Sequence, residues 1–259
     1  MRTIDLNCDC GESYGAYTMG NDEEMLKIVS SANIACGFHA GDPLVLHRTL
    51  SLAKENGVGV GAHPSFLDQW GFGRRRIEVD NLRELEQILV YQIAAVQGVA
   101  QTLGLKVRHV KPHGSLGNMA AEDYDLALAI GRAIKAVDPT MLYLTSPGNQ
   151  TQRAAEDLGL PIGMEIFADR AYDEAGNLMS RRREGAIIHD ADYAAERILR
   201  ILEEEAITTV DGKKIPVKAD TICVHGDNPN AVAMARKLRD RLVEAGYEIR
   251  PMWKTKAEA

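Results

Sequence analysis

The sequence predicts an α/β protein in one domain, with parallel strands arranged in a closed or nearly closed barrel. Short apolar segments rich in β-branched residues alternate with longer segments of helical period along the whole chain. This alternation is typical of a parallel sheet whose strands are joined by helices. Seven such units fit within 259 residues, a length that is usual for a single α/β barrel.

Seven segments have the length and composition of buried strands. They are residues 3–9, 31–36, 58–63, 107–113, 141–146, 163–169 and 221–227. Five further segments carry apolar residues at positions i, i+3, i+4 and i+7, as one face of a helix does: residues 42–56, 81–104, 121–137, 190–206 and 228–246. Several of these begin with Asp or Asn and end near Gly, the residues preferred at helix ends.

Two segments interrupt the alternation, at residues 172–188 and 207–219. Each has a Gly turn between extended arms, and the dipeptide Asp211-Gly212 is a strong signal for a hairpin. We expect both to be excursions from the barrel, so that residues 1–259 form a single domain. No fixed-period repeat or low-complexity linker divides the chain.

Composition and charge argue against several classes of protein. The chain has 37 acidic and 30 basic residues, and its formal net charge of −7 is unsuited to binding nucleic acid or an anionic membrane. No apolar run approaches the roughly 18 residues that span a bilayer, and the N-terminus has no apolar signal core. We therefore expect a cytoplasmic protein with no nucleic acid partner and no membrane partner.

The four cysteines do not form a zinc motif. Cys8 and Cys10 are separated by one residue, whereas a zinc site of this kind usually contains a C-x-x-C pair, and Cys36 and Cys223 stand alone. In a cytoplasmic protein we expect reduced thiols that pack as small apolar side chains.

Polar residues follow the predicted strands at a recurring position. His or Asp stands beside Gly or Pro at the ends of six strands, in LNCDCGE, IACGFHAGD, VGAHPS, VKPHGS, IFADR and CVHGDN. In a parallel barrel the carboxyl ends of the strands meet at one face, where the active sites of such folds lie. We expect one shared site that contains Asp9, Glu12, His39, His63, His113, Asp169, His225 and Asp227.

The other three histidines lie elsewhere in the pattern. His47 lies within a helical segment and His189 opens one, so both are expected at the surface or at a helix cap. His109 lies inside a strand, and we expect it in the core or in the barrel lumen rather than at a catalytic position.

The segment HVKPHGS carries the strongest individual chemistry. Lys111 precedes His113 by two residues, so the two side chains share one side of an extended strand. If that side faces the lumen, the buried ammonium would stabilise an oxyanion or a phosphoryl group, and His113 would donate or accept a proton. The alternative is a lysine at a strand end that reaches solvent.

Metal binding is a minor alternative. His109 and His113 form H-x-x-x-H, which on a helix would place two ligands on one face. In a strand the same four steps span about 13 Å, too far for one ion. Asp9, His63 and His113 could instead assemble a carboxylate and imidazole site suited to zinc or manganese, although their spacing gives no specific support.

Two Arg clusters indicate an anionic ligand or a docking face. WGFGRRR, at residues 70–76, and SRRREG, at residues 180–185, each place Arg beside Gly in an otherwise acidic protein. The planar guanidinium suits carboxylate and phosphate groups, and Gly lets the backbone approach a ligand closely. The sequence contains no phosphate-binding G-x-x-x-x-G-K-[ST] loop and no G-x-S-x-G nucleophile motif.

The motifs DLNCDCGE, NIACGFHAGD, GAHPSF with GFGRR, VKPHGSL, EIFADRAY and ICVHGD resemble those of the LamB/YcsF (lactam-utilisation) family, which includes the A subunit of bacterial 5-oxoprolinase. The likeness runs from the N-terminus to about residue 230. It implies an irregular seven-stranded β/α barrel related to polysaccharide-deacetylase and glycoside-hydrolase barrels. It also implies cleavage of 5-oxo-L-proline to L-glutamate with ATP as co-substrate, in a complex with subunits B and C.

The chain departs from the family's motifs at two places. The family usually reads KPHGALYN, whereas this chain has Ser115 and Gly117 in place of the Ala and the Tyr. The usual PSYPD is here PSFLD, with Phe66 and Leu67. Every His, Lys and acidic member of the motifs is present, so we expect the chemistry to be retained, while contacts near Gly117 could select a different lactam.

The resemblance suggests a mechanism in which the amide oxygen is phosphorylated, water attacks the activated carbon, and phosphate leaves as the ring opens. Lys111 with Arg74 or Arg75 would hold the phosphoryl and carboxylate charges. Asp9 or Glu12 would activate water, and His63 or His113 would protonate the ring nitrogen. The other residues expected to bind substrate are Asn7, His39, Asp42, Asp169, Arg170, His225 and Asp227.

Two rival functions fit the same residues. The first is a metal-dependent deacetylase or amidohydrolase, which the fold relationship and the Asp and His residues suggest. The second is a non-catalytic lactam-binding subunit whose partners handle ATP and perform the chemistry, which the missing phosphate-binding loop makes plausible.

Overall fold

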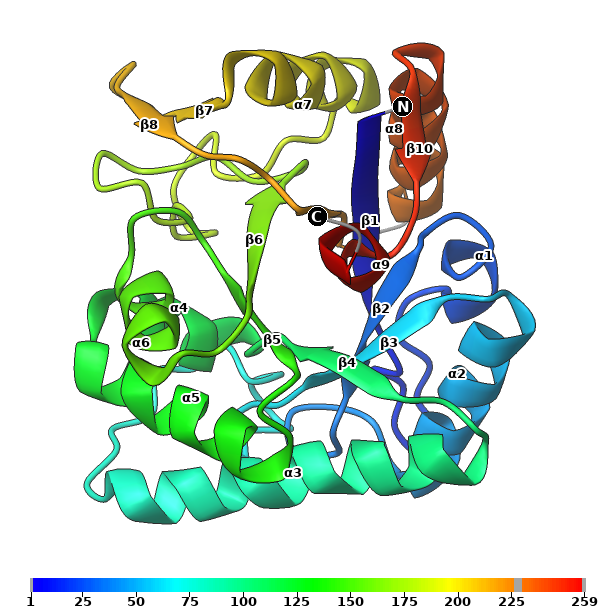
Figure 1. The fold of residues 1–259 in the computed structure, drawn as a ribbon, viewed down its shortest axis with the longest axis vertical. Coiled ribbons are helices and arrows are strands. Elements are labelled where there is room, and N and C mark those ends of the chain that lie inside the picture. Colours follow the sequence, from blue (N-terminus) through cyan, green and yellow to red (C-terminus); the bar gives the residue numbers. More distant parts are fainter. Residues whose placement is uncertain (1, 226–229, 258–259) are drawn as a thin grey trace.

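Seven parallel strands form a closed barrel, as the sequence predicts (Figure 1). The computed structural model describes residues 2–225 and 230–257. The barrel strands are β1 (Arg2–Cys10), β2 (Ser31–Ala35), β3 (Gly59–His63), β4 (Val107–Val110), β5 (Leu142–Thr145), β6 (Ile162–Phe167) and β9 (Thr221–Cys223). Each pairs in parallel with the next, and β9 pairs with β1 to close the ring. All their carboxyl ends therefore lie at one end of the barrel.

Strand β1 is long enough to pair with three different strands. Residues 2–4 pair with β10 (Tyr247–Ile249), residues 5–7 with β9, and residues 7–10 with β2. The strand β10 was not predicted, since three residues are too few for a pattern of period two to be visible.

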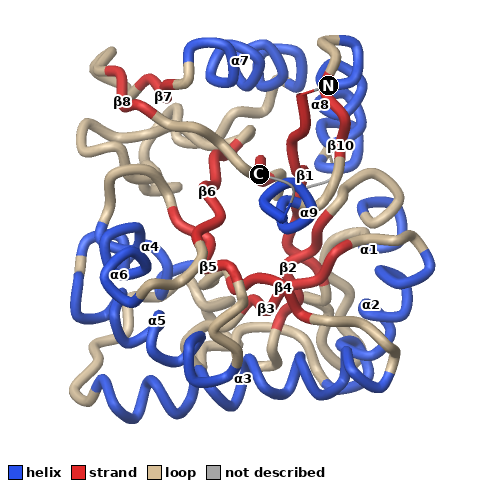
Figure 2. Tube along the Cα trace, viewed as in Figure 1, coloured by secondary structure: helices blue, strands red, loops and turns tan. Residues whose placement is uncertain are grey.

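Helices surround the barrel and are drawn in blue in Figure 2. Their bounds are α1 (Asp22–Met25), α2 (Pro43–Glu55), α3 (Leu82–Thr102), α4 (Gly114–Glu122), α5 (Tyr124–Val137), α6 (Gln150–Leu158), α7 (Ala191–Glu204), α8 (Ala231–Glu244) and α9 (Met252–Ala257). The predicted caps are present, because the side chains of Asp42, Asn81 and Asp190 accept hydrogen bonds from the first turns of α2, α3 and α7. Among the described residues, no helix is long and apolar enough to cross a bilayer.

The last helix, α9, covers the amino-terminal end of the barrel. Met252 is fully buried and forms a small apolar cluster with Leu142 and Leu144 of β5. The opposite, carboxyl end of the strands is therefore the end that is left for a functional site.

The two predicted excursions have different structures. Strands β7 (Ala206–Thr208) and β8 (Lys214–Pro216) pair antiparallel around the turn that contains Asp211 and Gly212. Residues 172–188 instead form a loop tied by the antiparallel bridges Tyr172–Leu178 and Arg170–Ile187.

The segment predicted as a strand over 107–113 ends earlier, at Val110. The backbone stays beside β3, because the amide of Lys111 donates to the carbonyl of Ala62 (3.0 Å) and that of His113 to the carbonyl of Pro64 (2.8 Å). Pro112 has no N–H and cannot continue a strand ladder. Helix α4 begins immediately afterwards, and it and α6 were not predicted. The last predicted strand, 221–227, ends at Cys223, and residues 226–229 lie outside the described part of the chain.

The barrel lumen contains a polar layer as well as apolar side chains. The ring of His109 lies directly against Gly61 on the neighbouring strand, where a Cβ atom would be 2.2 Å from the imidazole. Burial lowers the pKa of His109 to about 3, so the imidazole is neutral. This placement confirms the expectation of a lumen or core position for His109.

Candidate active site

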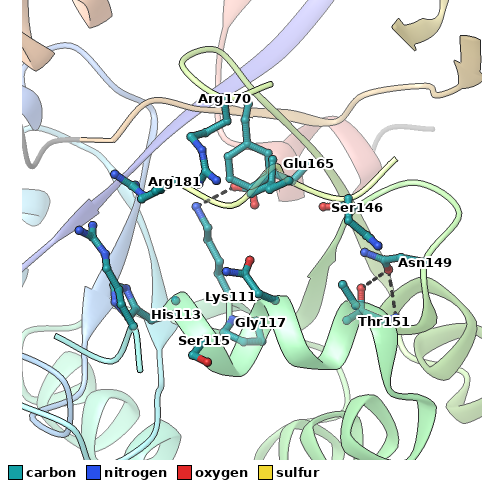
Figure 3. A pocket seen from close by; sticks show the side chains of 18 of the residues that line it. Lys111, His113, Ser115, Gly117, Ser146, Asn149, Thr151, Glu165, Arg170 and Arg181 are labelled. Carbon is teal, nitrogen blue, oxygen red and sulfur yellow. Dashed lines mark hydrogen bonds and ion pairs between the residues drawn. The ribbon is translucent and has the colours of Figure 1, made fainter. Parts of the chain in front are cut away.

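A cavity of about 650 Å³ opens at the carboxyl ends of the barrel strands (Figure 3). In Figure 3, Lys111 lies at its centre, with His113, Arg170 and Arg181 on one side and Ser146, Asn149 and Thr151 on the other. The predicted site residues that line it directly are Asp9, His63, Arg74, Lys111, His113, Arg170 and His225. Strand ends that are far apart in the sequence thus converge on one space, as the pattern of polar residues predicts.

Lys111 is buried and faces the lumen, so it is not a lysine that reaches solvent. Its Nζ lies 3.2 Å from Oδ1 of Asp9 and 3.0 Å from Oε1 of Glu165. Burial alone would lower the pKa of Lys111, but attraction to Asp9 and Glu165 raises it well above its ordinary value. Lys111 is therefore a fixed positive charge at the inner end of the cavity.

The Asp9 carboxylate is the main partner of this charge. Burial alone would raise the pKa of Asp9, but the adjacent His63 and Lys111 hold it well below its usual range. Asp9 also accepts a hydrogen bond from the side-chain amide of Asn33 (2.9 Å). The carboxylate is thus ionised and held in place from two sides.

Hydrogen bonds beneath Lys111 link the site to the barrel interior. The side-chain amide of Asn7 donates to Glu165 (3.0 Å) and to Thr221 (2.7 Å), and its carbonyl oxygen accepts from Asn33 (2.7 Å). Nε2 of His109 lies 2.8 Å from the carbonyl oxygen of Asn33. Asn7 was predicted to bind substrate, but it does not line the cavity and instead holds Glu165 and Asn33.

Three imidazoles and one carboxylate gather behind the cavity wall. Nε2 of His63 lies 3.0 Å from Nδ1 of His113, and the rings of His39 and His113 are stacked with centroids 3.7 Å apart. Oε1 of Glu12 is 3.1 Å from Nε2 of His39 and 3.4 Å from Nδ1 of His113. Four strand ends, those of β1 to β4, therefore supply one compact group, which we call the histidine cluster: Glu12, His39, His63 and His113.

Backbone carbonyls assign the tautomers of two of these rings. Nδ1 of His63 lies 2.6 Å from the carbonyl oxygen of Lys111, and Nε2 of His113 lies 2.8 Å from that of Phe72. A carbonyl oxygen only accepts, so each of these nitrogens must carry a hydrogen. Burial first, and the neighbouring His39 and His63 next, lower the pKa of His113 well below its ordinary value, so its ring is neutral. In the neutral rings Nε2 of His63 and Nδ1 of His113 are therefore unprotonated.

The Gly-rich segment near residue 72 covers the cluster. Phe72 has a φ of 53°, which is uncommon for a residue with a side chain, and its ring makes edge contacts with His39 and His113. Gly73 has a φ of 62°, and a Cβ atom there would lie 2.8 Å from the His113 ring. Only glycine fits at this position, and the turn directs Arg74 into the cavity wall.

Arginines dominate one side of the cavity. Arg74 and Arg170 line it together with the second Arg cluster, Arg181, Arg182 and Arg183. Arg170 is buried, and burial followed by repulsion from Arg181 lowers its pKa to about 10, so it stays charged at neutral pH. This side is suited to a carboxylate or phosphate group.

His225 and Asp169 form a second wall. Nδ1 of His225 lies 2.9 Å from the carboxylate of Asp169, and its ring is stacked on Phe167 with centroids 5.9 Å apart. Burial alone would raise the pKa of Asp169, but His225 lowers it. Asp169 supports His225 from behind, and the predicted Asp227 lies outside the described residues.

Two of the predicted substrate-binding residues lie away from the cavity. Arg75 forms an ion pair with the buried carboxylate of Asp68, at the turn that follows β3. Asp42 caps helix α2, accepting from the amides of Leu44 (2.8 Å) and Val45 (2.9 Å). Both stabilise the loops that carry the site.

Glu165 is the main site residue that the sequence pattern does not identify. It lies in the middle of β6, whereas the recurring pattern concerns residues that follow strands. A single carboxylate inside the apolar run GMEIF was the signal that could have revealed it.

The cysteines are free and buried. Cys8, Cys10 and Cys36 pack in the core as expected. Cys223 differs, because Nζ of Lys111 donates to its sulfur at 2.9 Å, and burial raises the pKa of the thiol well above its ordinary value. It is a neutral neighbour of the Lys111 charge.

Comparison with known proteins places this site in a family. Residues 4–257 match the LamB/YcsF family. The chain belongs to this family. It is 49% identical over 251 residues to a 5-oxoprolinase A subunit of Bradyrhizobium diazoefficiens, which is 97% of this chain and 98% of that protein. It is 47% identical over 252 residues to the 5-oxoprolinase A subunit of Natranaerobius thermophilus, again 97% and 98% of the two chains.

Solved structures confirm the predicted fold class. The lactam utilization protein of Thermus thermophilus has a TM-score of 0.90 and 43% identity, over 96% of this chain and 99% of that one. A peptidoglycan N-acetylglucosamine deacetylase domain from Eubacterium rectale has a TM-score of 0.51 at 10% identity, over 96% of this chain and 88% of that one. At that identity the likeness concerns the fold alone, and it confirms the expected relationship to deacetylase barrels.

Proposed function

We propose that this chain is the A subunit of a cytoplasmic 5-oxoprolinase and carries out the opening of 5-oxo-L-proline to L-glutamate, coupled to ATP hydrolysis. The proposal is supported by relatives of that name at 47–49% identity over nearly the whole chain. The observation that carries it is the buried Lys111 charge, which faces a cavity with further arginines along one wall.

The charges of the cavity match those of the substrate. 5-Oxoproline carries a carboxylate, and phosphorylation of its amide oxygen adds further negative charge. Arg74 and Arg170 bind these anionic groups, because guanidinium forms paired hydrogen bonds with carboxylate and phosphate. Lys111 lies at the reacting oxygen, where a fixed ammonium in a buried site stabilises developing negative charge.

The attacking water is activated at His63 and His113. Their cavity-side nitrogens carry no hydrogen, so either can accept a proton from water. Oδ2 of Asp9 lies 3.4 Å from Nε2 of His63 and would stabilise the imidazolium formed. The proton then passes to the ring nitrogen as the C–N bond breaks. Asp9, whose pKa is held low, thus supports the base rather than acting as one.

ATP is handled with the help of partner subunits. The sequence has no phosphate-binding loop of the G-x-x-x-x-G-K-[ST] type, and the relatives' names denote one subunit of a larger enzyme. We assign the coupling of ATP hydrolysis to the complex of this chain with subunits B and C.

The decisive assay measures glutamate released from 5-oxoproline by the chain with and without ATP and with and without subunits B and C. The full mixture with ATP should release glutamate, and Arg74→Ala should reduce the rate strongly. Arg132→Ala is the matched control, because Arg132 pairs with Glu86 on the outer helices away from the cavity. A full mixture that releases no glutamate, or an Arg74→Ala protein as active as the control, contradicts the proposal.

Calorimetry with the isolated chain separates catalysis from mere binding. The cavity predicts that 5-oxoproline binds to the chain alone, because the anion-binding arginines belong to it. If Lys111→Met binds the lactam as the wild type does and the reconstituted mixture retains its turnover, the chain only binds the lactam and its partners perform the chemistry.

A further inference from the structure

The histidine cluster has the composition of a metal site. Glu12, His39, His63 and His113 each offer one ligand atom, and these atoms all lie within 4.8 Å of one another. All four side chains are buried. Imidazole and carboxylate together suit zinc and neighbouring divalent transition metals.

The electrostatics of the cluster require a positive charge between the rings. Nε2 of His63 and Nδ1 of His113 are unprotonated in the neutral rings, yet they face each other at 3.0 Å. Oε1 of Glu12 adds a third lone pair, 3.4 Å from Nδ1 of His113. Three acceptors that converge without a hydrogen between them repel one another, and a cation at their centre would turn that repulsion into attraction.

The spacing fits bonds to one small ion. Metal–nitrogen bonds of 2.0–2.1 Å in a tetrahedral site place neighbouring ligand atoms about 3.3 Å apart. The distances from Nδ1 of His113 to Nε2 of His63 and to Oε1 of Glu12, 3.0 and 3.4 Å, lie close to that value. Only small shifts of side chains would be needed.

The surroundings of the rings are also those of metal ligands. A metal-bound histidine usually donates its other N–H to a carbonyl or a carboxylate, which fixes its orientation. His63 does so to the carbonyl of Lys111, and His113 to the carbonyl of Phe72. His39 lies 3.1 Å from Glu12 and can hold the carboxylate in the same way.

We propose that this chain binds one divalent transition metal through Nε2 of His63, Nδ1 of His113 and Oε1 of Glu12, with His39 as a positioning residue for Glu12. This set differs from the Asp9, His63 and His113 set considered from the sequence, because Asp9 is paired with Lys111. His63 and His113 line the cavity, so an open coordination position faces the substrate space. A metal there would bind and activate the water assigned above to the two rings.

Metal binding is tested without any substrate, so it stands or falls separately from the proposed function. The protein is stripped with a chelator and titrated with Co²⁺, whose visible absorption reports nitrogen and oxygen ligation, and then with Zn²⁺ in competition. We expect one Co²⁺ per chain, displaced by one Zn²⁺. His113→Gln and Glu12→Gln should abolish the absorption, and His39→Gln should weaken binding about 10- to 100-fold, as loss of a supporting residue does.

The control is His47→Gln, because His47 lies on α2 away from the cluster and any binding at the surface would involve it or residues like it. Its titration should match that of the wild type. Thermal melting of each variant, with and without Zn²⁺, shows whether it folds, and only proteins with an intact site should gain stability from the metal. Absence of a stoichiometric site in the wild type, or binding unchanged in Glu12→Gln, overturns the proposal and leaves a shared proton between His63 and His113.

Discussion

Replacing Lys111 by Met removes the central charge of the site while keeping a side chain of similar length. Asp9 and Glu165 then remain buried without their shared cation, which lay 3.2 and 3.0 Å away. Removing one partner of a buried ion pair usually costs about 3–5 kcal/mol. For a chain of this size that corresponds to a fall in Tm of about 10 °C. Turnover in the reconstituted mixture should be lost as well.

The control for this change is Lys106→Met. Lys106 precedes β4 and its side chain is 47% exposed, in a 3.5 Å ion pair with Asp138. Such a surface pair is worth at most about 1 kcal/mol, so Tm should hardly change. The double variant Lys111→Met/Glu165→Gln should recover part of the stability, because one of the two uncompensated carboxylates is gone.

The pH dependence gives an independent check. In the wild type the pKa of Asp9 is held low, so Asp9 contributes stability that is present above its unfolded pKa and lost as the pH falls through the folded value. Without Lys111 the buried carboxylate takes up a proton more readily. The deficit of Lys111→Met should therefore be largest at neutral pH and shrink towards about pH 4, the usual pKa of Asp. A variant as stable as Lys106→Met at neutral pH, or one that retains full turnover, refutes the reasoning.

Three further predictions concern the barrel itself. Gly61→Ala should destabilise the protein by about 1–3 kcal/mol in urea unfolding, because its Cβ would overlap the His109 ring, whereas Gly98→Ala, with open space around it, should not destabilise it. Asp190→Ala should cost about 1 kcal/mol in the same assay, because it removes the side-chain cap of α7. Burial raises the pKa of Asp5 to about 6, so Asp5 favours the folded state below its unfolded pKa and that contribution is lost as the pH rises through 6. Tm measured from pH 4 to 7 should therefore fall less for Asp5→Asn than for the wild type, and equal slopes would contradict the assignment.

The barrel and the location of its site could be predicted because both depend on periodic or repeated features. Apolar runs of period two and helical segments of period 3.6 identify the strands and helices of a parallel fold. The side chains that follow the strands, such as His63 and His113, must meet because parallel strands end at the same face. Topology alone therefore brings distant residues together.

The short elements could not be predicted in the same way. Helix α4 has only nine residues and contains Gly114, Ser115 and Gly117, which are poor helix formers. Tertiary contacts stabilise it against the sequence preference, because Leu116 and Ala120 are fully buried.

Contacts between specific side chains were also beyond the sequence. Arg74 and Arg75 are adjacent and chemically identical, and only the turn at Gly73 decides which of them faces the cavity. Glu165 lies within a strand, so its role depends on which strand faces it across the lumen, here β4 with Lys111 just beyond its end. Such pairings depend on three-dimensional register, which a single sequence does not contain.

The seam between β1 and β9 joins residues that a ribosome adds at very different times. Thr221 donates a hydrogen bond to Asp5 at 2.6 Å across 216 positions of sequence. At ordinary elongation rates about 10 to 40 s separate the synthesis of these two residues. During that interval β1 and β6 have open edges, and Cys223 is not yet beside Lys111. A nascent chain therefore exposes two strand edges, which are prone to aggregation, until almost the whole protein has been made.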